Sequence, residues 1–176
     1  MANRKNIKKG LINGSRLDNE FKRLHRDLFA DVYPWAGEVR DYSTGRGSAP
    51  FCLPDFIDSN MQRIFAALRA ADGLRTLSPD QFAVRAAEVI NEINAVHPFI
   101  EGNGRVSREF LKDLAQHAGH PIDLSRLTRA TWCAAAARGF DNPGDNAPMR
   151  DCIRSAMIEP ERAPARDRDR GRDDLV

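Results

Sequence analysis

The sequence predicts an almost wholly helical domain that carries one short β-hairpin. Apolar residues recur at helical spacing in six separate segments of the chain. Between the first two segments, residues 33–56 break this spacing with three prolines, three glycines and several β-forming side chains, which is typical of a hairpin or extended loop. A chain of 176 residues can bury one sizeable core, so a single domain is expected.

Six helices are expected in order along the chain. Residues 17–32 and 57–71 each place large apolar side chains on one face. Residues 79–96 follow a clear start signal, because Ser78 can cap the first turn and Pro79 suits its first position. The remaining three helices are expected over residues 106–117, 127–140 and 149–158.

Both ends of the chain are expected to lie outside the folded domain. Residues 1–16 are basic and contain glycines and asparagines, which favours a flexible lead-in. Residues 161–176 are almost wholly charged, small or proline, which favours a disordered tail. The domain itself is therefore predicted over residues 17–160.

Charge, hydropathy and cysteine usage exclude several classes of function. A net charge of +2 is far from that of a dedicated nucleic-acid binder, and aspartates nearly cancel the arginines of the tail. No apolar run reaches the roughly 18 residues of a membrane span, and none follows the basic N-terminus as a secretory leader requires. Cys52, Cys133 and Cys152 lack a metal-binding spacing and are expected to be free, mostly buried thiols. A cytoplasmic location is predicted, and delivery into a host cell stays open.

The residues with the clearest chemistry are 97–105, HPFIEGNGR. Pro98 disfavours helical geometry at His97, so the preceding helix should end there. Asn103 is expected to cap a new helix that begins near Arg105. Since glycines on either side of Asn103 permit unusual backbone geometry, the loop should expose several unpaired amides, which favour an anion.

Charged side chains beside this loop suit a nucleotide. Arg105 and Arg108 are three positions apart and can both contact phosphates. Glu101 suits Mg²⁺, which prefers one or two carboxylates together with phosphate oxygens. His97 can take a proton near neutral pH. Each residue alone is also typical of a turn, a solvated charge or a capping histidine, but their concentration at one junction favours a phosphoryl- or nucleotidyl-transfer site.

The segment HPFIEGNGRVSR resembles the signature of the Fic family, H-P-F-x-D/E-G-N-G-R-x-x-R, at every defined position. Upstream, LHRDLFADVYPWAGEVR and APFCLP are similar to the segments that precede and complete the family's flap. The resemblance spans roughly residues 17–158. It implies an all-helical, Fic-type bundle with a small β-hairpin flap.

The resemblance also implies an activity, which is transfer of AMP from ATP to a Tyr, Thr or Ser hydroxyl of a target protein with release of pyrophosphate. His97 would be the general base, and Glu101 would bind the Mg²⁺ that bridges the phosphates. Gly102, Asn103 and Gly104 would form the anion-binding hole, Arg105 would contact the phosphate chain and Arg108 the γ-phosphate. A target segment would dock by β-augmentation on the flap, for which the candidates are Gly47, Ser48, Ala49, Pro50 and Phe51.

Many members of this family are silenced by a helix with the pattern Ser/Thr-x-x-x-Glu-Gly/Asn, whose glutamate pairs with the second arginine. Ser155 is followed four residues later by Glu159, but Pro160 stands where glycine or asparagine is expected. The match is interpreted as coincidence. The chain is then expected to resemble the toxin of a toxin–antitoxin pair, with the inhibitory helix on a separate small protein.

Other interpretations keep or change the chemistry. Kinase-type relatives carry a lysine where this chain has Gly104, which favours nucleotidyl over phosphoryl transfer. Transfer of UMP, GMP or phosphocholine, and a non-catalytic binding module of the same fold, are alternatives. His117 and His120 have a spacing that suits two metal ligands, but the sequence offers no evident third ligand.

Overall fold

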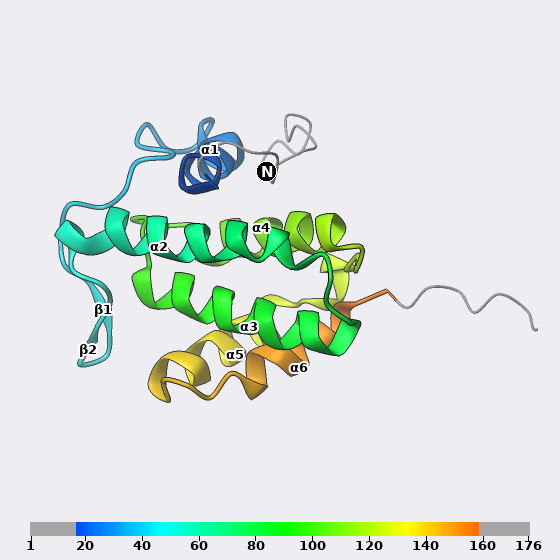
Figure 1. Ribbon diagram of the computed structural model, residues 1–176. Coiled ribbons are helices and arrows are strands. Elements are labelled where there is room, and N and C mark those ends of the chain that lie inside the picture. Colours follow the sequence, from blue (N-terminus) through cyan, green and yellow to red (C-terminus); the bar gives the residue numbers. More distant parts are fainter. Residues whose placement is uncertain (1–16, 159–176) are drawn as a thin grey trace, which may run out of the picture.

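The computed structural model describes residues 17–158, and it confirms a mostly helical domain with one two-stranded hairpin (Figure 1). Residues 1–16 and 159–176 lie outside the described part, so the expected domain boundaries stay a prediction. The elements are α1 (Leu17–Phe29), β1 (Gly45–Arg46), β2 (Ala49–Pro50), η2 (Pro54–Phe56), α2 (Ile57–Ala70), η3 (Asp72–Leu74), α3 (Pro79–Val96), α4 (Asn103–Ala118), η4 (Leu124–Arg126), α5 (Arg129–Asp141) and α6 (Ala147–Ala156).

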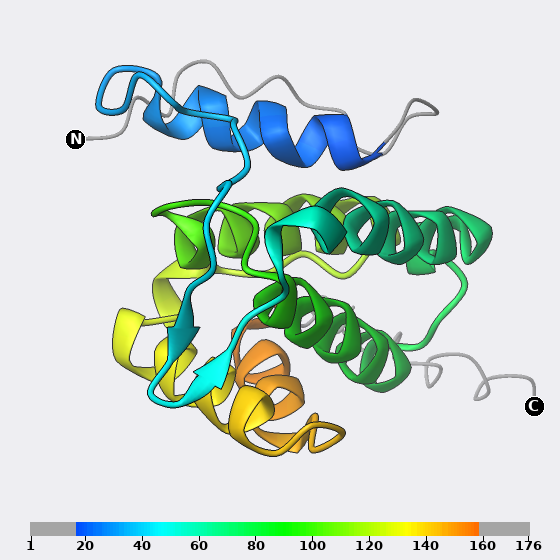
Figure 2. The same cartoon turned by 90° about the vertical axis from the view of Figure 1, so that its left-hand side faces the viewer.

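The helices lie in layers around α3. This central helix contacts α2 and α4 on one side and α5 and α6 on the other, and α1 covers α2 and α4 (Figures 1 and 2). A phenylalanine cluster joins α1 to α2, to α4 and to the loop after α3, because the Phe21 ring lies 5.5–5.7 Å from the rings of Phe65, Phe99 and Phe110. Such aromatic contacts add to the stabilisation from burial itself. Phe99 belongs to the loop after α3, so the core fixes this loop directly.

The two ends of α3 follow local signals in the sequence. At its start, the Gln81 N–H donates to the Ser78 hydroxyl (3.3 Å), and the Ser78 N–H donates to the Gln81 side chain (3.0 Å). This reciprocal capping box, with Pro79 at the first position, confirms the predicted start. At its end, His97 leaves the helix with a φ of 49°, as the following proline predicts.

Two expectations about cysteines and membranes can be compared with the described residues. The three cysteines are free, as expected. They are not mostly buried, however, because Cys133 is exposed and the other two are only half-buried. No helix within residues 17–158 is long and apolar enough to cross a membrane. The cytoplasmic location stays a prediction.

Asp113 of α4 is a carboxyl group whose ionisation the fold opposes. Burial raises its pKa from 3.8 to about 6, and Lys112 offsets only part of this effect. At pH values above both pKa values the folded protein holds a poorly solvated carboxylate at Asp113. Well below both values the carboxyl group is protonated in the folded and in the unfolded protein. Asp113→Asn is therefore expected to raise the melting temperature at about pH 8 and to lose this gain below about pH 4.

Thermal unfolding at several pH values tests this expectation. The exposed Asp31 provides a matched control, because Asp31→Asn changes the same chemical group without relieving a buried charge. An equal rise in melting temperature for Asp113→Asn at about pH 8 and below about pH 4 would contradict this explanation.

Candidate active site

The loop between α3 and α4 is tight because two of its residues adopt left-handed backbone geometry. His97 has a φ of 49° and Gly102 a φ of 87°. A side chain at position 102 would also collide with α1, since a Cβ there would lie 2.6 Å from the Phe29 ring. Only glycine therefore lets the loop pass this close to α1.

Asn103 holds the loop in shape from within. Its side-chain oxygen accepts a hydrogen bond from the Phe99 N–H (3.0 Å), and its amide nitrogen donates to the Phe99 carbonyl (2.8 Å). The prediction that Asn103 caps a helix beginning near Arg105 is wrong, because α4 begins at Asn103 and Gly102 is its N-cap. With the side chain engaged, the backbone N–H is the group of Asn103 left to bind a ligand.

The first turn of α4 presents a group of unpaired amides. The Arg105 N–H bonds back to the Gly102 carbonyl (3.0 Å). Within residues 17–158, the N–H groups of Gly102, Asn103 and Gly104 have no acceptor, as expected where a helix begins. These three amides and the helix dipole favour a negatively charged group. The Trp132 indole of α5 borders them, since its Nε1 would lie 3.8 Å from a Cβ on Gly104.

The imidazole of His97 is covered by an aromatic ring. Phe51 stacks on it with a centroid distance of 3.9 Å and an interplanar angle of 6°. Burial lowers the pKa of His97 below its ordinary 6.5, and the Arg40 cation acts in the same direction. The Asn94 carbonyl opposes part of this shift, although no hydrogen bond of ordinary geometry joins it to the buried Nδ1. The ring is therefore neutral near pH 7, and Nε2 is the nitrogen left to accept a proton.

Arg40 is a buried cation that joins the hairpin to the end of α3. It is 1% exposed, and its guanidinium donates to the carbonyls of Tyr42 (2.7 Å) and Cys52 on the two arms of the hairpin. It also donates to the carbonyls of Val96 (3.1 Å) and His97 (2.8 Å). Burial lowers the pKa of Arg40, yet four backbone oxygens compensate its charge. The sequence did not reveal this role, because the partners in α3 are far along the chain.

His25 anchors the loop from the side of α1, and it too was not predicted. The Gly37 N–H donates to Nδ1 (2.9 Å), so Nδ1 carries no proton and Nε2–H donates to the Glu101 carbonyl (2.9 Å). Burial lowers the pKa of His25, which keeps the ring neutral and preserves both bonds. A signal was available, because His25 lies four residues from both Phe21 and Phe29 and so shares their buried face.

The charged residues expected to bind nucleotide and metal are held in different ways. Glu101 and Arg105 are exposed with their charged atoms 4.0 Å apart, and the Arg105 guanidinium lies 4.3 Å from the centroid of the Phe29 ring. Arg108 is partly buried and donates to the Leu124 carbonyl (3.2 Å) of η4. Its Nε has no hydrogen-bond partner within residues 17–158. Glu101 and Arg105 thus come together beside the amides, whereas Arg108 is anchored one turn further along α4.

The described residues can supply a metal ion with few ligands of their own. No group of three His, Cys, Asp or Glu side chains within residues 17–158 could hold a metal. The His117 and His120 pair does not provide such a site, since the Nε2 atom of His120 is bonded to the Leu77 carbonyl (2.8 Å). Mg²⁺ fits Glu101 nonetheless, because beside a nucleotide this ion takes one or two carboxylates and completes its shell with phosphate oxygens and water.

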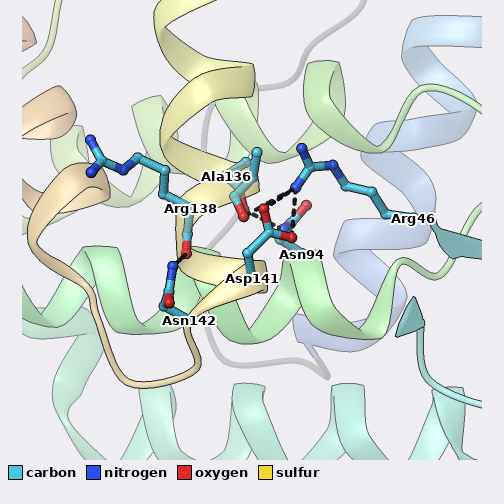
Figure 3. A network of polar contacts seen from close by, with 7 residues as sticks. Arg46, Asn94, Ala136, Arg138, Asp141 and Asn142 are labelled. Atoms are coloured by element: carbon cyan, nitrogen blue, oxygen red, sulfur yellow. Dashed lines mark hydrogen bonds and ion pairs between the residues drawn. The ribbon is translucent and has the colours of Figure 1, made fainter. Parts of the chain in front are cut away.

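The predicted hairpin forms and is docked on α5. β1 and β2 pair antiparallel, with Arg46 opposite Ala49. The Arg46 guanidinium donates to both carboxylate oxygens of Asp141 (2.7 and 2.8 Å) at the end of α5 (Figure 3). Figure 3 also shows Asn94 of α3 bonded to the Ala136 carbonyl (3.2 Å), which ties α5 to the helix before the loop.

The five residues expected to dock a target differ in their exposure. Gly47 and Ser48 of the turn and Ala49 and Pro50 of β2 are exposed. Phe51 follows directly and is partly buried. Its ring contacts the His97 ring and the Phe140 ring of α5, the latter at 4.8 Å.

Known proteins share both the sequence and the fold of this chain. The model of the Fic/DOC family matches residues 17–115. A protein from Sinorhizobium fredii named probable protein adenylyltransferase y4lH is 44% identical over 135 residues, which cover 76% of this chain and 69% of that relative. The protein adenylyltransferase VbhT of Bartonella schoenbuchensis is 36% identical over 80% of this chain, which spans 29% of that longer protein.

A solved structure gives the same result for the fold. The BepC protein of Bartonella tribocorum, described as a VirB-translocated effector with bound AMPPNP, superposes with a TM-score of 0.72. The two sequences are 27% identical, and the match covers 82% of this chain and 75% of that chain.

Replacing Arg40 tests its role in holding the hairpin and the loop. Arg40→Met leaves four backbone carbonyls without a donor and is expected to lower the free energy of unfolding by at least about 3 kcal/mol. In Arg40→Lys the ammonium group keeps the charge but can bond to fewer carbonyls, so an intermediate loss of the free energy of unfolding is expected. Denaturant unfolding measures both, with the exposed Arg69→Met as a control. A loss no larger than that of the control would contradict the role.

Proposed function

The chain belongs to the Fic/DOC family, and from this we propose that it is a protein adenylyltransferase, which moves AMP from ATP to a hydroxyl group of a target protein. The observation that carries the proposal is the junction of α3 and α4. There a half-buried, neutral histidine shares one tight loop with the unpaired amides of residues 102–104. The relatives named adenylyltransferases, and the AMPPNP bound to BepC, support the same chemistry.

His97 is proposed as the general base. Its Nε2 accepts the proton of the target hydroxyl while the hydroxyl oxygen forms a bond to the α-phosphorus of ATP. The bond from that phosphorus to the bridging oxygen breaks, and pyrophosphate leaves with the electron pair. Burial and Arg40 both disfavour the imidazolium, so the captured proton passes readily to water and the base is restored.

The nucleotide is proposed to bind along the first turns of α4. The amides of Gly102, Asn103 and Gly104 stabilise the charge that develops on the α-phosphate, because they are already oriented and need no rearrangement. Arg105 and Arg108 bind the phosphate chain, Arg108 at the γ-phosphate. Glu101 would hold Mg²⁺, which when bound neutralises phosphate charge.

The target is proposed to dock on the hairpin. Residues 45–50 are exposed, and the two strands form a sheet of only two members, so an extended target segment can add a further strand. Because Arg46 fixes the hairpin on α5, the docked segment would meet the loop in a defined orientation.

Radiolabelled ATP tests the proposed reaction. The chain is incubated with lysate, Mg²⁺ and ATP labelled in the α-phosphate, and transfer of label to a protein band is expected. His97→Ala is expected to lower the transfer rate by about 10²-fold or more, because it removes the base. His117→Ala, on the same helix as the amides but at its far end, serves as the control.

Two outcomes would contradict the reaction as proposed. Undiminished transfer by His97→Ala would overturn the role of this histidine. Label appearing only from γ-labelled ATP would indicate a kinase instead.

We also propose that an inhibitory helix, where one exists, comes from a separate small protein. Within α6 the Ser155 hydroxyl is engaged with the Cys152 carbonyl (2.8 Å), while Glu159 and Pro160 lie outside the described residues. Glu159→Gly is therefore expected to leave the AMP transfer rate of the isolated chain unchanged. A clear rise in rate for this variant would instead show that the chain inhibits itself through Glu159.

A further inference from the structure

The ring of Phe51 lies between the candidate base and α5. It stacks on the His97 imidazole at 3.9 Å with the planes 6° apart, and its other neighbour is the Phe140 ring at 4.8 Å and 50°. A nearly parallel contact at this distance leaves the imidazole little freedom to tilt. The contact therefore restricts the ring that must present Nε2 to a hydroxyl.

The usual device for orienting a catalytic histidine is a hydrogen bond to its second nitrogen. His97 lacks one, because its Nδ1 is buried and makes no hydrogen bond of ordinary geometry within residues 17–158. Arg40 fixes only the backbone of this residue, through its carbonyl. Apart from the Asn94 carbonyl, which acts on the imidazole without an ordinary hydrogen bond, the two side-chain torsions of His97 are left to packing, and Phe51 is the ring packed against it.

Phe51 is itself held from two directions. Its N–H donates to the Thr44 carbonyl (2.9 Å) across the hairpin, and the next N–H, of Cys52, donates to the Ala95 carbonyl (3.1 Å) of α3. At the tip, the bond between Arg46 and Asp141 fixes the hairpin on the same turn of α5 that carries Phe140. The position of the Phe51 ring therefore depends on both α3 and α5.

We propose that Phe51 is a positioning residue that holds the His97 ring in the orientation for proton transfer and makes this orientation depend on the docking of the hairpin on α5. The inference rests on the proposed function and deepens it. Phe51 was expected to contact the target, whereas the geometry assigns its ring to the base.

Three substitutions at position 51 distinguish orientation of the His97 ring from its simple burial. Phe51→Ala removes the cover over this ring, Phe51→Leu keeps an apolar cover without a ring plane, and Phe51→Tyr keeps the ring plane. Phe51→Ala and Phe51→Leu are expected to lower kcat for AMP transfer by roughly 10- to 100-fold with little change in the KM for ATP. Phe51→Tyr is expected to stay near the wild type.

The pH profile distinguishes the two apolar variants. Phe51→Ala lets water reach the imidazole, which raises the pKa of His97 back toward 6.5. Because the base must be neutral, the acid limb of the kcat profile should move to higher pH in Phe51→Ala. In Phe51→Leu, which still covers the ring, this limb should move less.

Proton NMR provides a readout that does not depend on activity. The Phe51 ring current should shift the His97 ring protons upfield, and Phe51→Leu should abolish this shift while Phe51→Tyr retains it. His97→Gln identifies these resonances among those of the four histidines. Thermal unfolding confirms that each variant is folded.

Two results would overturn the positioning role while leaving the proposed function intact. One is a Phe51→Leu variant with the kcat of the wild type and only a higher KM for the target, which would make Phe51 a target contact. The other is an unshifted His97 resonance in the wild type. Absence of AMP transfer by the wild type itself would instead overturn the proposed function.

Discussion

The buried guanidinium of Arg40 is the interaction on which the hairpin, the end of α3 and the candidate base all depend. A charge that is 1% exposed destabilises a fold unless its donors are bonded, and here backbone carbonyls accept all the hydrogen bonds that it makes. The strands of the hairpin have two residues each and cannot hold its arms by themselves. Arg40 therefore replaces the ladder that a longer sheet would provide, and it does so at the point where His97 leaves α3.

Two histidines near this point, the buried His25 and the half-buried His97, have opposite tasks. His25 has a partner on each ring nitrogen, so its tautomer is fixed and it serves as a link between α1 and the loop. His97 has an aromatic ring on its face and no ordinary hydrogen bond at Nδ1. Burial lowers the pKa of both, but only in His97 does this leave a nitrogen with no task in the fold. Structural and chemical roles thus follow from the partners and not from the residue type.

Features of this domain that depend on neighbours in the chain were predictable, and those that depend on distant contacts were not. The helix start at Ser78 and Pro79 and the helix end before Pro98 each involve only a few consecutive residues. Asn103 was misjudged because its side chain can cap the helix that follows or bond to the preceding backbone, and the packing of the loop selected the second option. Arg40 binds carbonyls beyond position 90, which no periodicity reveals.

The hairpin is attached to α5 by polar contacts of Arg46, which bonds to Asp141 and to the Ala137 carbonyl (3.3 Å), and by the apolar contact of Phe51, and the two kinds respond differently to dissolved salt. Arg46 and Asp141 are 49% and 53% exposed, so counterions screen their attraction as the ionic strength rises. The contact between Phe51 and Phe140 is apolar and gains nothing from low salt. Concentrated salt should therefore release the tip of the hairpin at Arg46 while the contact of Phe51 with α5 persists. The tip could then move relative to α5 about the position of Phe51.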